Sequence, residues 1–248
     1  MRLSVDTGCR LGVGRLDQAE DLAVRLVHPV AQVADAVPLL GVQVCRMGPL
    51  NVGPADRATT AGILRPGTER VILFHVVASG TCWVSVDDGE KHWASDGDVI
   101  VLPYGDQHRM GGVKDARAVP LMTIMQAPPW HRLPVIRHGQ EGSRTDLVCG
   151  FLHSDDPLFD PRLRVFPRVF VIRPATSASA GWVQANIAYA LDQADTSPLG
   201  PDSIPSRLPE LLLIEVLREH LRTAPAADHG WVAALRDPVL RPALAAVH

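Results

Sequence analysis

One stretch of the chain, Gly97 to His108, constrains the fold more strongly than any other, and it reads G-D-V-I-V-L-P-Y-G-D-Q-H. The four apolar residues 99–102 have the length and composition of a buried strand. Pro103 and Gly105 follow directly and are typical of tight turns, because proline fixes φ and glycine accepts positive φ. The pattern predicts a buried strand that ends in a turn, which presents His108 at the start of the next segment.

The composition is that of an ordinary globular protein. At 248 residues with 46% hydrophobic content, the chain can bury the core of one large domain or of two small ones. Its net charge of -3, from 24 basic and 27 acidic residues, lacks the basic excess of a chain that grips nucleic acid along its length. Arginine greatly outnumbers lysine, which indicates GC-rich, bacterial coding.

The sequence shows no pattern typical of export or membrane insertion. No apolar stretch approaches the roughly 20 residues of a membrane span, and the N-terminus lacks the charged and apolar regions of a signal peptide. The four cysteines, Cys9, Cys45, Cys82 and Cys149, form no C-x-x-C pair, which favours reduced thiols. We therefore expect a cytoplasmic protein without disulfides or membrane contact.

The hydrophobic pattern divides the chain into three parts. Residues 1–38 form an N-terminal arm with a short helix at Val30–Val37, because apolar residues there recur at helical spacing. Residues 39–155 hold short apolar or alternating runs separated by turns, which predicts an antiparallel barrel or sandwich. The predicted strands are Gly41–Met47, Ala58–Leu64, Val71–Val77, Thr81–Val86, Lys91–Ala94, Val99–Leu102, Val119–Gln126 and Thr145–Phe151, with a hairpin turn at Asp87–Glu90 and a loop over residues 127–146.

Residues 156–248 are predicted to be helical, with helices at Gly181–Leu191, from Ser206 to about Arg222, and from about Gly230. The run Leu211–Ile214 is apolar on every side of its helix. That helix either packs within the chain or pairs with a second copy, and we favour a homodimer because an apolar turn exposed on all sides invites a partner. The candidate dimerisation residues are Leu208, Leu211, Leu212, Glu215 and Leu217.

The glycine–proline–glycine–histidine string resembles the second motif of the cupin superfamily, in which the histidine points into a small barrel and often binds a metal. The match covers every fixed position but the last, where Gly112 stands in place of asparagine. The first cupin motif, H-x-H followed by a glutamate, is missing: His75 is alone, and Val77 occupies the position of the second histidine. This argues against the iron or manganese of cupin enzymes, which need a mixed ligand set.

Two interpretations of these histidines stay open. His75, Cys82, His108 and Cys149 could hold zinc tetrahedrally if the barrel brings their strands together. Alternatively, the cysteines pack as small hydrophobes and the histidines form hydrogen bonds. Trp83, Trp93 and Tyr104 are the aromatic residues nearest the motif, and with His75 and His108 they are candidates for a ligand pocket, although aromatics on alternating strands also fill cores.

A longer series of segments resembles the cupin-type sensor and dimerisation domain of AraC-family transcription regulators over residues 30–248. The segments are residues 74–83 (F-H-V-V-A-S-G-T-C-W), the glycine–histidine motif, 147–151 (L-V-C-G-F), 207–218, 230–238 (G-W-V-A-A-L-R-D-P) and 243–248 (A-L-A-A-V-H). The order of these motifs is specific, whereas residues 49–56 lack the Pro-Trp pair usual in the family. In that family two helix-turn-helix units follow the final histidine, so the resemblance implies DNA binding only through a domain beyond His248.

The resemblance implies a mainly β fold with α-helices, a cupin (jelly-roll-like) barrel followed by a helical segment, and a function without catalysis. The chain would bind a small-molecule effector or a metal in the barrel and dimerise through its helices, and a shift between two arrangements of barrel and helices would carry the signal. A stand-alone metal-dependent cupin enzyme, an isomerase or dioxygenase using metal at His75 and His108, is the alternative. A third possibility is a packed barrel that only assembles with partners.

Overall fold

The structure is a computed structural model of the whole chain, and it describes residues 43–47, 51–53, 61–62, 67–68, 70–113, 119–124, 135–138, 143–154, 157–174, 180–196, 204–223, 233 and 237–240. The predicted N-terminal arm, with its helix at Val30–Val37, lies outside the described residues, as does almost all of the predicted helix from Gly230.

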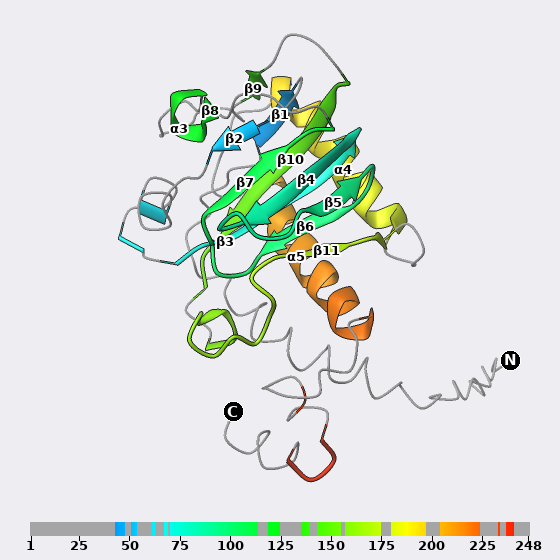
Figure 1. Cartoon of the computed structure of the whole chain (residues 1–248). Helices are drawn as coiled ribbons and strands as arrows, with labels where there is room; N and C mark the ends of the chain where they lie inside the picture. Colours follow the sequence, from blue (N-terminus) through cyan, green and yellow to red (C-terminus); the bar gives the residue numbers. More distant parts are fainter. Residues whose placement is uncertain are drawn as a thin grey trace, which may run out of the picture.

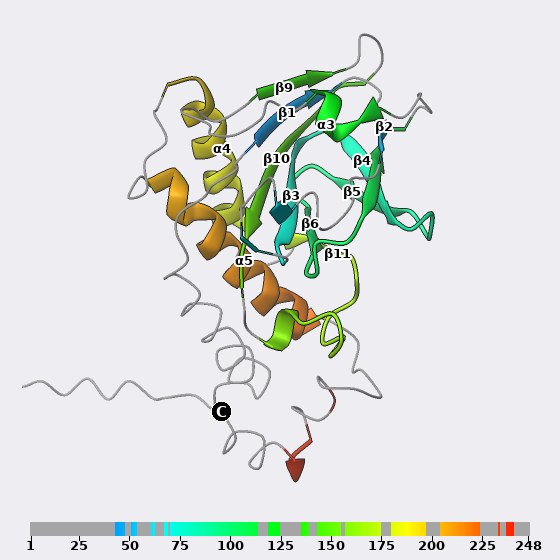
Figure 2. The same cartoon turned by 90° about the vertical axis from the view of Figure 1, so that its left-hand side faces the viewer.

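Two β-sheets face each other and form the body of the molecule (Figures 1 and 2). The larger sheet has the order β11 (Phe170–Ile172), β6 (Val99–Leu102), β3 (Ile72–Ser79), β10 (Thr145–Leu152), β1 (Gln43–Met47), β9 (Val135–His138). The smaller sheet has the order β5 (His92–Ser95), β4 (Thr81–Val86), β7 (His108–Gly111), β2 (Asn51–Gly53), β8 (Val119–Pro120). Most pairs are antiparallel, but β1 with β9 and β2 with β8 are parallel.

Two long helices, α4 (Ala180–Thr196) and α5 (Ile204–Thr223), lie against the outer face of the larger sheet, as Figure 2 shows. Helix α4 contacts β1 and β10, and α5 contacts β10 and β11. Two short helices, α3 (Leu121–Ile124) and η2 (Pro157–Phe159), lie in connections between strands. The predicted class, mainly β with C-terminal helices, is confirmed. Within the described part of the chain, no helix is long and apolar enough to span a membrane.

The larger sheet separates two hydrophobic cores. One core lies between this sheet and the helices, and the other, which we call the inner core, lies between the two sheets. Strand β3 contributes to both, because successive side chains point to opposite faces of a sheet. Phe74 and Val76 pack toward the helices, whereas Leu73 and Val77 belong to the inner core. His75, between Phe74 and Val76, therefore faces the inner core.

Several predictions of local structure are confirmed. Strands β4 and β6 have the predicted bounds, and a hairpin turn joins β4 to β5. In this turn Asp87 and Asp88 take positive φ angles of 48° and 57°. The N–H of Gly89 donates a hydrogen bond to the carbonyl of Val86 at 2.9 Å. The aspartates accept the left-handed conformation here, as aspartate can in tight hairpin turns.

Four predictions of local structure are wrong. Residues 61–62 of the predicted strand Ala58–Leu64 are helical, and the strand predicted at Val119–Gln126 ends at Pro120, where α3 follows. Proline has no N–H to continue a ladder. The predicted loop 127–146 contains β9, and the segment predicted to be helical from residue 156 contains β11, so the larger sheet extends past residue 155. Both missed strands are short and pair with strands distant in the sequence, so local pattern gives little sign of them.

Candidate functional site

The glycine–histidine motif carries the chain from the larger sheet to the smaller one. It begins at Gly97, whose φ of 82° favours glycine, and continues into β6. After β6 the N–H of Gly105 donates to the carbonyl of Leu102 at 3.1 Å. Gly105 has a φ of 60°, and a side chain there would lie 2.5 Å from the carbonyl oxygen of Val71. The predicted turn is confirmed, and it places His108 at the first position of β7 in the opposite sheet.

His75 and His108 meet between the sheets. Their ring centroids are 5.3 Å apart with an interplanar angle of 51°. His108 Nδ1 lies 3.0 Å from the backbone carbonyl of Asp106. Both ring nitrogens of His75 are buried, and neither has a hydrogen-bond partner among the described residues. The two histidines named from the sequence are thus brought together from β3 and β7.

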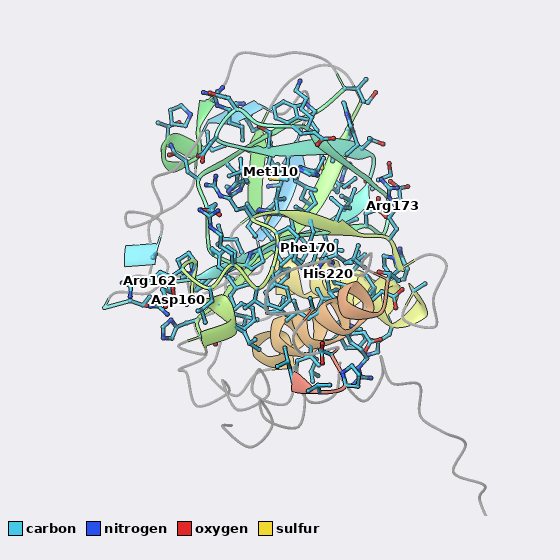
Figure 3. The ribbon with its side chains drawn as sticks, turned by 60° about the horizontal axis from the view of Figure 1, so that its bottom comes forward. Met110, Asp160, Arg162, Phe170, Arg173 and His220 are labelled. Carbon is cyan, nitrogen blue, oxygen red and sulfur yellow. The ribbon has the colours of Figure 1, made fainter. Side chains whose placement is uncertain are left out.

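The environment of the pair is apolar and disfavours charge. Burial lowers the pKa of His75 to about 3, and the neighbouring His108 adds to this shift. Burial also lowers the pKa of His108, while the carbonyl and the carboxylate of Asp106 oppose the shift. The inner core around them contains side chains such as Ile100 and Met110, and Figure 3 shows Met110 between the two sheets. Both imidazoles are therefore neutral at neutral pH.

The two cysteines predicted as zinc ligands do not complete a metal site. Cys149 is half-buried and lies opposite His75 in the register of β10 and β3. Cys82 is fully buried on β4, and burial together with nearby Asp98 raises the pKa of its thiol to about 12. Across the described ranges no three His, Cys, Asp or Glu side chains are placed to hold a metal ion. The structure assembles the histidine pair and not the four-residue set.

The tryptophans predicted for a ligand pocket lie on the outer face of the smaller sheet. On β4, Cys82 and Val84 belong to the inner core, so Trp83 between them faces outward. Trp83 covers Gly111, its Nε1 donates to the carbonyl of Gly112 at 3.1 Å, and the ammonium of Lys91 lies 4.2 Å from the centroid of its ring. Trp93 is paired with Trp83 across β4 and β5 and is 42% exposed. Both tryptophans therefore lie on the opposite side of the smaller sheet from the histidine pair, and their assignment to a ligand pocket stays a prediction.

Tyr104 belongs to the core between the larger sheet and the helices, and not to the inner core. Its hydroxyl donates to the backbone carbonyl of Phe166 at 3.0 Å and accepts from the N–H of Phe166 at 2.8 Å. This residue anchors the segment that leads into β11. Tyr104 is therefore not brought together with the histidine pair, because the turn directs its side chain to the outer side of the larger sheet, and its assignment to a pocket stays a prediction.

The residues predicted for dimerisation divide into two groups. Leu212 and Leu217 are buried in the core between α5 and the larger sheet, so they pack within the chain and their assignment to an intersubunit contact is wrong. Leu211 is 50% exposed, and Glu215 is partly exposed 3.7 Å from Arg218. The side chain of Leu208 lies outside the described residues.

Two further contacts were not predicted, one at the motif and one in the core beneath the helices. Arg168 donates through Nε to Asp106 at 3.0 Å and through Nη1 to Asp87 at 2.6 Å, which ties the turn of the motif to the hairpin turn. His220 of α5 stacks on Phe170 of β11 with centroids 3.9 Å apart, as Figure 3 shows. The residues in each of these contacts are distant from one another in the sequence, so the sequence pattern did not predict them. Only Asp106, which lies within the motif and is buried, could have indicated that a charged partner was needed.

Two facing sheets, joined by a glycine–proline–glycine turn that delivers a histidine to their interior, define a domain of the cupin type. A family model described as cupin matches residues 46–222, and the chain belongs to this family. It is 25% identical over 179 residues to the HTH-type transcriptional regulator AlkR of Acinetobacter baylyi, covering 71% of this chain and 58% of that protein. It is 32% identical over 195 residues to a Streptomyces lividans protein described as an AraC-like transcription regulator, covering 72% and 58%.

The resemblance to the cupin domain of AraC-family regulators is thus confirmed, and the chain spans about 58% of the length of these relatives. Among solved structures, the apo form of ToxT from Vibrio cholerae is similar with a TM-score of 0.37 and 6% identity, over 84% of this chain and 75% of that chain.

Proposed function

We propose that this chain is the ligand-sensing domain of an AraC-type transcription regulator, which binds a small effector between its two sheets. The observation that carries the proposal is His75, whose buried nitrogens have no hydrogen-bond partner in the described part of the chain and whose ring lies beside that of His108 in an otherwise apolar interior. Leaving a buried polar group without a hydrogen bond costs about 1–3 kcal/mol. A ligand that supplies the missing bonds would recover this cost, so the pair is suited to recognise a small molecule.

The sheet offers a route from the ligand to the helices. On β3, His75 faces the inner core, while its neighbours Phe74 and Val76 pack in the core beneath α4 and α5. A movement of this strand on ligand binding would therefore change the packing of the helices. The ligand shifts the equilibrium between two helix arrangements only as far as its affinities for them differ. We place DNA binding in a region of the regulator outside residues 46–222. We also propose that the protein is cytoplasmic, as the sequence predicts.

A thermal-shift screen of this chain with a library of small molecules tests the proposal. A ligand that binds only the folded state at 100 times its dissociation constant stabilises the protein by about 2.7 kcal/mol. We expect hits that raise the melting temperature of the wild type and of a Trp93→Leu control on the outer face, but not of His75→Leu. Hits that stabilise His75→Leu equally would place the ligand elsewhere.

We also propose that the domain forms a homodimer through the exposed side of α5. Leu211 is 50% exposed on this helix, whose other side packs on the larger sheet. Light scattering after gel filtration tests this with Leu211→Glu, which should shift a dimer toward monomer. Val113→Glu is the matched control, because Val113 is 68% exposed just after β7 in the smaller sheet, which the larger sheet separates from α5. A wild-type chain that stays monomeric at high concentration would contradict the dimer.

The alternative, a metal-dependent cupin enzyme, is less well supported. The described residues assemble no group of three metal-binding side chains, and the similar proteins are named as transcription regulators. An enzyme of this kind would need an open metal position beside a general base. Elemental analysis of the purified chain distinguishes the two: stoichiometric metal that is lost in both His75→Ala and His108→Ala would favour the enzyme.

A further inference from the structure

The hydrogen bond of His108 Nδ1 determines what the other ring nitrogen, Nε2, can do. Nδ1 lies 3.0 Å from the carbonyl oxygen of Asp106, and a carbonyl only accepts. Nδ1 must therefore carry the proton of the neutral ring, which leaves Nε2 as an acceptor without a proton. Any ligand that satisfies His108 must donate a hydrogen bond to this nitrogen.

His75 adds the complementary requirement. A neutral imidazole has one N–H donor and one bare nitrogen that accepts, and both nitrogens of His75 are buried without a partner among the described residues. Its ring centroid is 5.3 Å from that of His108, so one small polar group can lie within reach of both rings. The group that completes the pair must therefore both donate, to His108 Nε2, and accept, from the N–H of His75.

Charged groups fit this pair poorly. A carboxylate only accepts and would leave His108 Nε2 unpaired, whereas an ammonium only donates and would leave the N–H of His75 unpaired. The buried carboxylates of Asp98 and Asp106 lie near Arg173 and Arg168 respectively, so they are not free to balance a ligand cation. Burial lowers the pKa of both histidines, so neither supplies a positive charge for an anion at neutral pH. Bringing an unpaired charge into this interior would be costly.

We propose that the effector is a neutral, mainly apolar molecule with one hydroxyl group, which donates to His108 Nε2 and accepts from His75. The apolar body would contact inner-core side chains such as Ile100, Met110 and Phe151. This inference rests on the proposed function, because it specifies the chemistry of the same site between the sheets. A hydroxyl is the smallest group that meets both demands at once.

The first measurement is nitrogen NMR of the histidine rings in the intact chain at neutral pH. The proposal requires a neutral His108 with its proton on Nδ1 and a neutral His75. A protonated imidazolium at either position, or a proton on Nε2 of His108, would overturn the hydroxyl assignment. The second measurement adds three probes of one shape at millimolar concentration: benzyl alcohol, benzoate and benzylammonium.

Benzyl alcohol should shift the ring signals of both histidines and bind at least tenfold more tightly than the two ions, a difference of about 1.4 kcal/mol. Its binding should weaken at least tenfold in His108→Leu and remain unchanged in Trp93→Leu. Tighter binding of benzoate or benzylammonium at the histidines would overturn the hydroxyl assignment but leave the sensing site in place. If none of the three probes moves the histidine signals, both this inference and the proposed site between the sheets fail.

Discussion

Acid should begin to destabilise this protein through His75 at a pH well above the range in which carboxylates titrate. Burial lowers the pKa of His75 to about 3 from its usual value of 6.5, and the unfolded chain restores the usual value. Below pH 6.5 the unfolded state therefore takes up a proton that the folded state excludes. Stability conferred by the neutral ring is complete above this value, and it is lost progressively as the pH falls toward 3.

The magnitude follows from the width of this window. Each unit of pH between the two pKa values costs about 1.4 kcal/mol. Acidification from about pH 6.5 to about pH 5 should therefore remove about 2 kcal/mol of the free energy of unfolding through His75 alone. The lowered pKa of His108 acts in the same direction. For a domain of marginal stability this is a large loss.

Urea denaturation of the wild type and of His75→Leu at a series of pH values measures the effect. The difference in free energy of unfolding between the two should change by about 2 kcal/mol over that interval, in favour of the variant at low pH. At neutral pH the variant should be as stable as the wild type or more so, because it removes an unpaired buried polar group. Trp93→Leu, on the outer face, should keep the pH dependence of the wild type. Parallel loss of stability in the wild type and His75→Leu would refute the argument that burial holds the ring neutral.

Three further predictions concern the scaffold and are measured on the purified chain. In Gly150→Ala the new methyl group would lie 2.1 Å from the ring of the facing phenylalanine, so unfolding should become easier by about 1–3 kcal/mol, whereas Gly181→Ala, with open space around it, should not destabilise. Urea titration measures the free energy of unfolding of both variants. A Gly150→Ala variant as stable as the wild type would contradict the close packing around this glycine. Arg168→Leu should cost about 1–3 kcal/mol by removing the ion pairs of the arginine to the buried Asp106 and to Asp87, while Arg109→Leu, which breaks an exposed ion pair, should cost about 0–1 kcal/mol. Cys82 should resist iodoacetamide in the folded protein and react only after denaturation, because burial raises the pKa of its thiol to about 12, and mass spectrometry that finds it labelled in the native chain would contradict its placement.

The sequence predicts the motif at Gly97–His108 well because the constraints on it are local. The proline and glycines require one particular turn, whatever the rest of the chain does. The buried strand before the turn needs only its four apolar residues to be recognised. The location of His108 at the start of β7 then follows from the length of the turn.

The sequence predicts less well on which face of a sheet each side chain lies, because this depends on the register between paired strands. In β4, which reads T-C-W-V-S-V, Cys82, Val84 and Val86 form an apolar face, but Trp83 on the other face is a large apolar side chain that is equally typical of a core. Whether Trp83 or its neighbour Cys82 faces inward is decided by pairing with β5 and β7, and a slip of one residue would exchange them. Strands β9 and β11 were not predicted for the same reason: they have only four and three residues, and they pair with strands that are distant in the sequence.

The position of β3 between two cores has a consequence for how this sequence can change over evolutionary time. Almost every side chain of β3 is enclosed on one side or the other, so a replacement at any position must suit the volume of an existing interior. Strand β5 differs, since only Ala94 is fully buried while Trp93 and Ser95 face solvent. Among descendants of this chain, β3 should therefore drift slowly along its whole length, whereas β5 is free to vary at alternate positions.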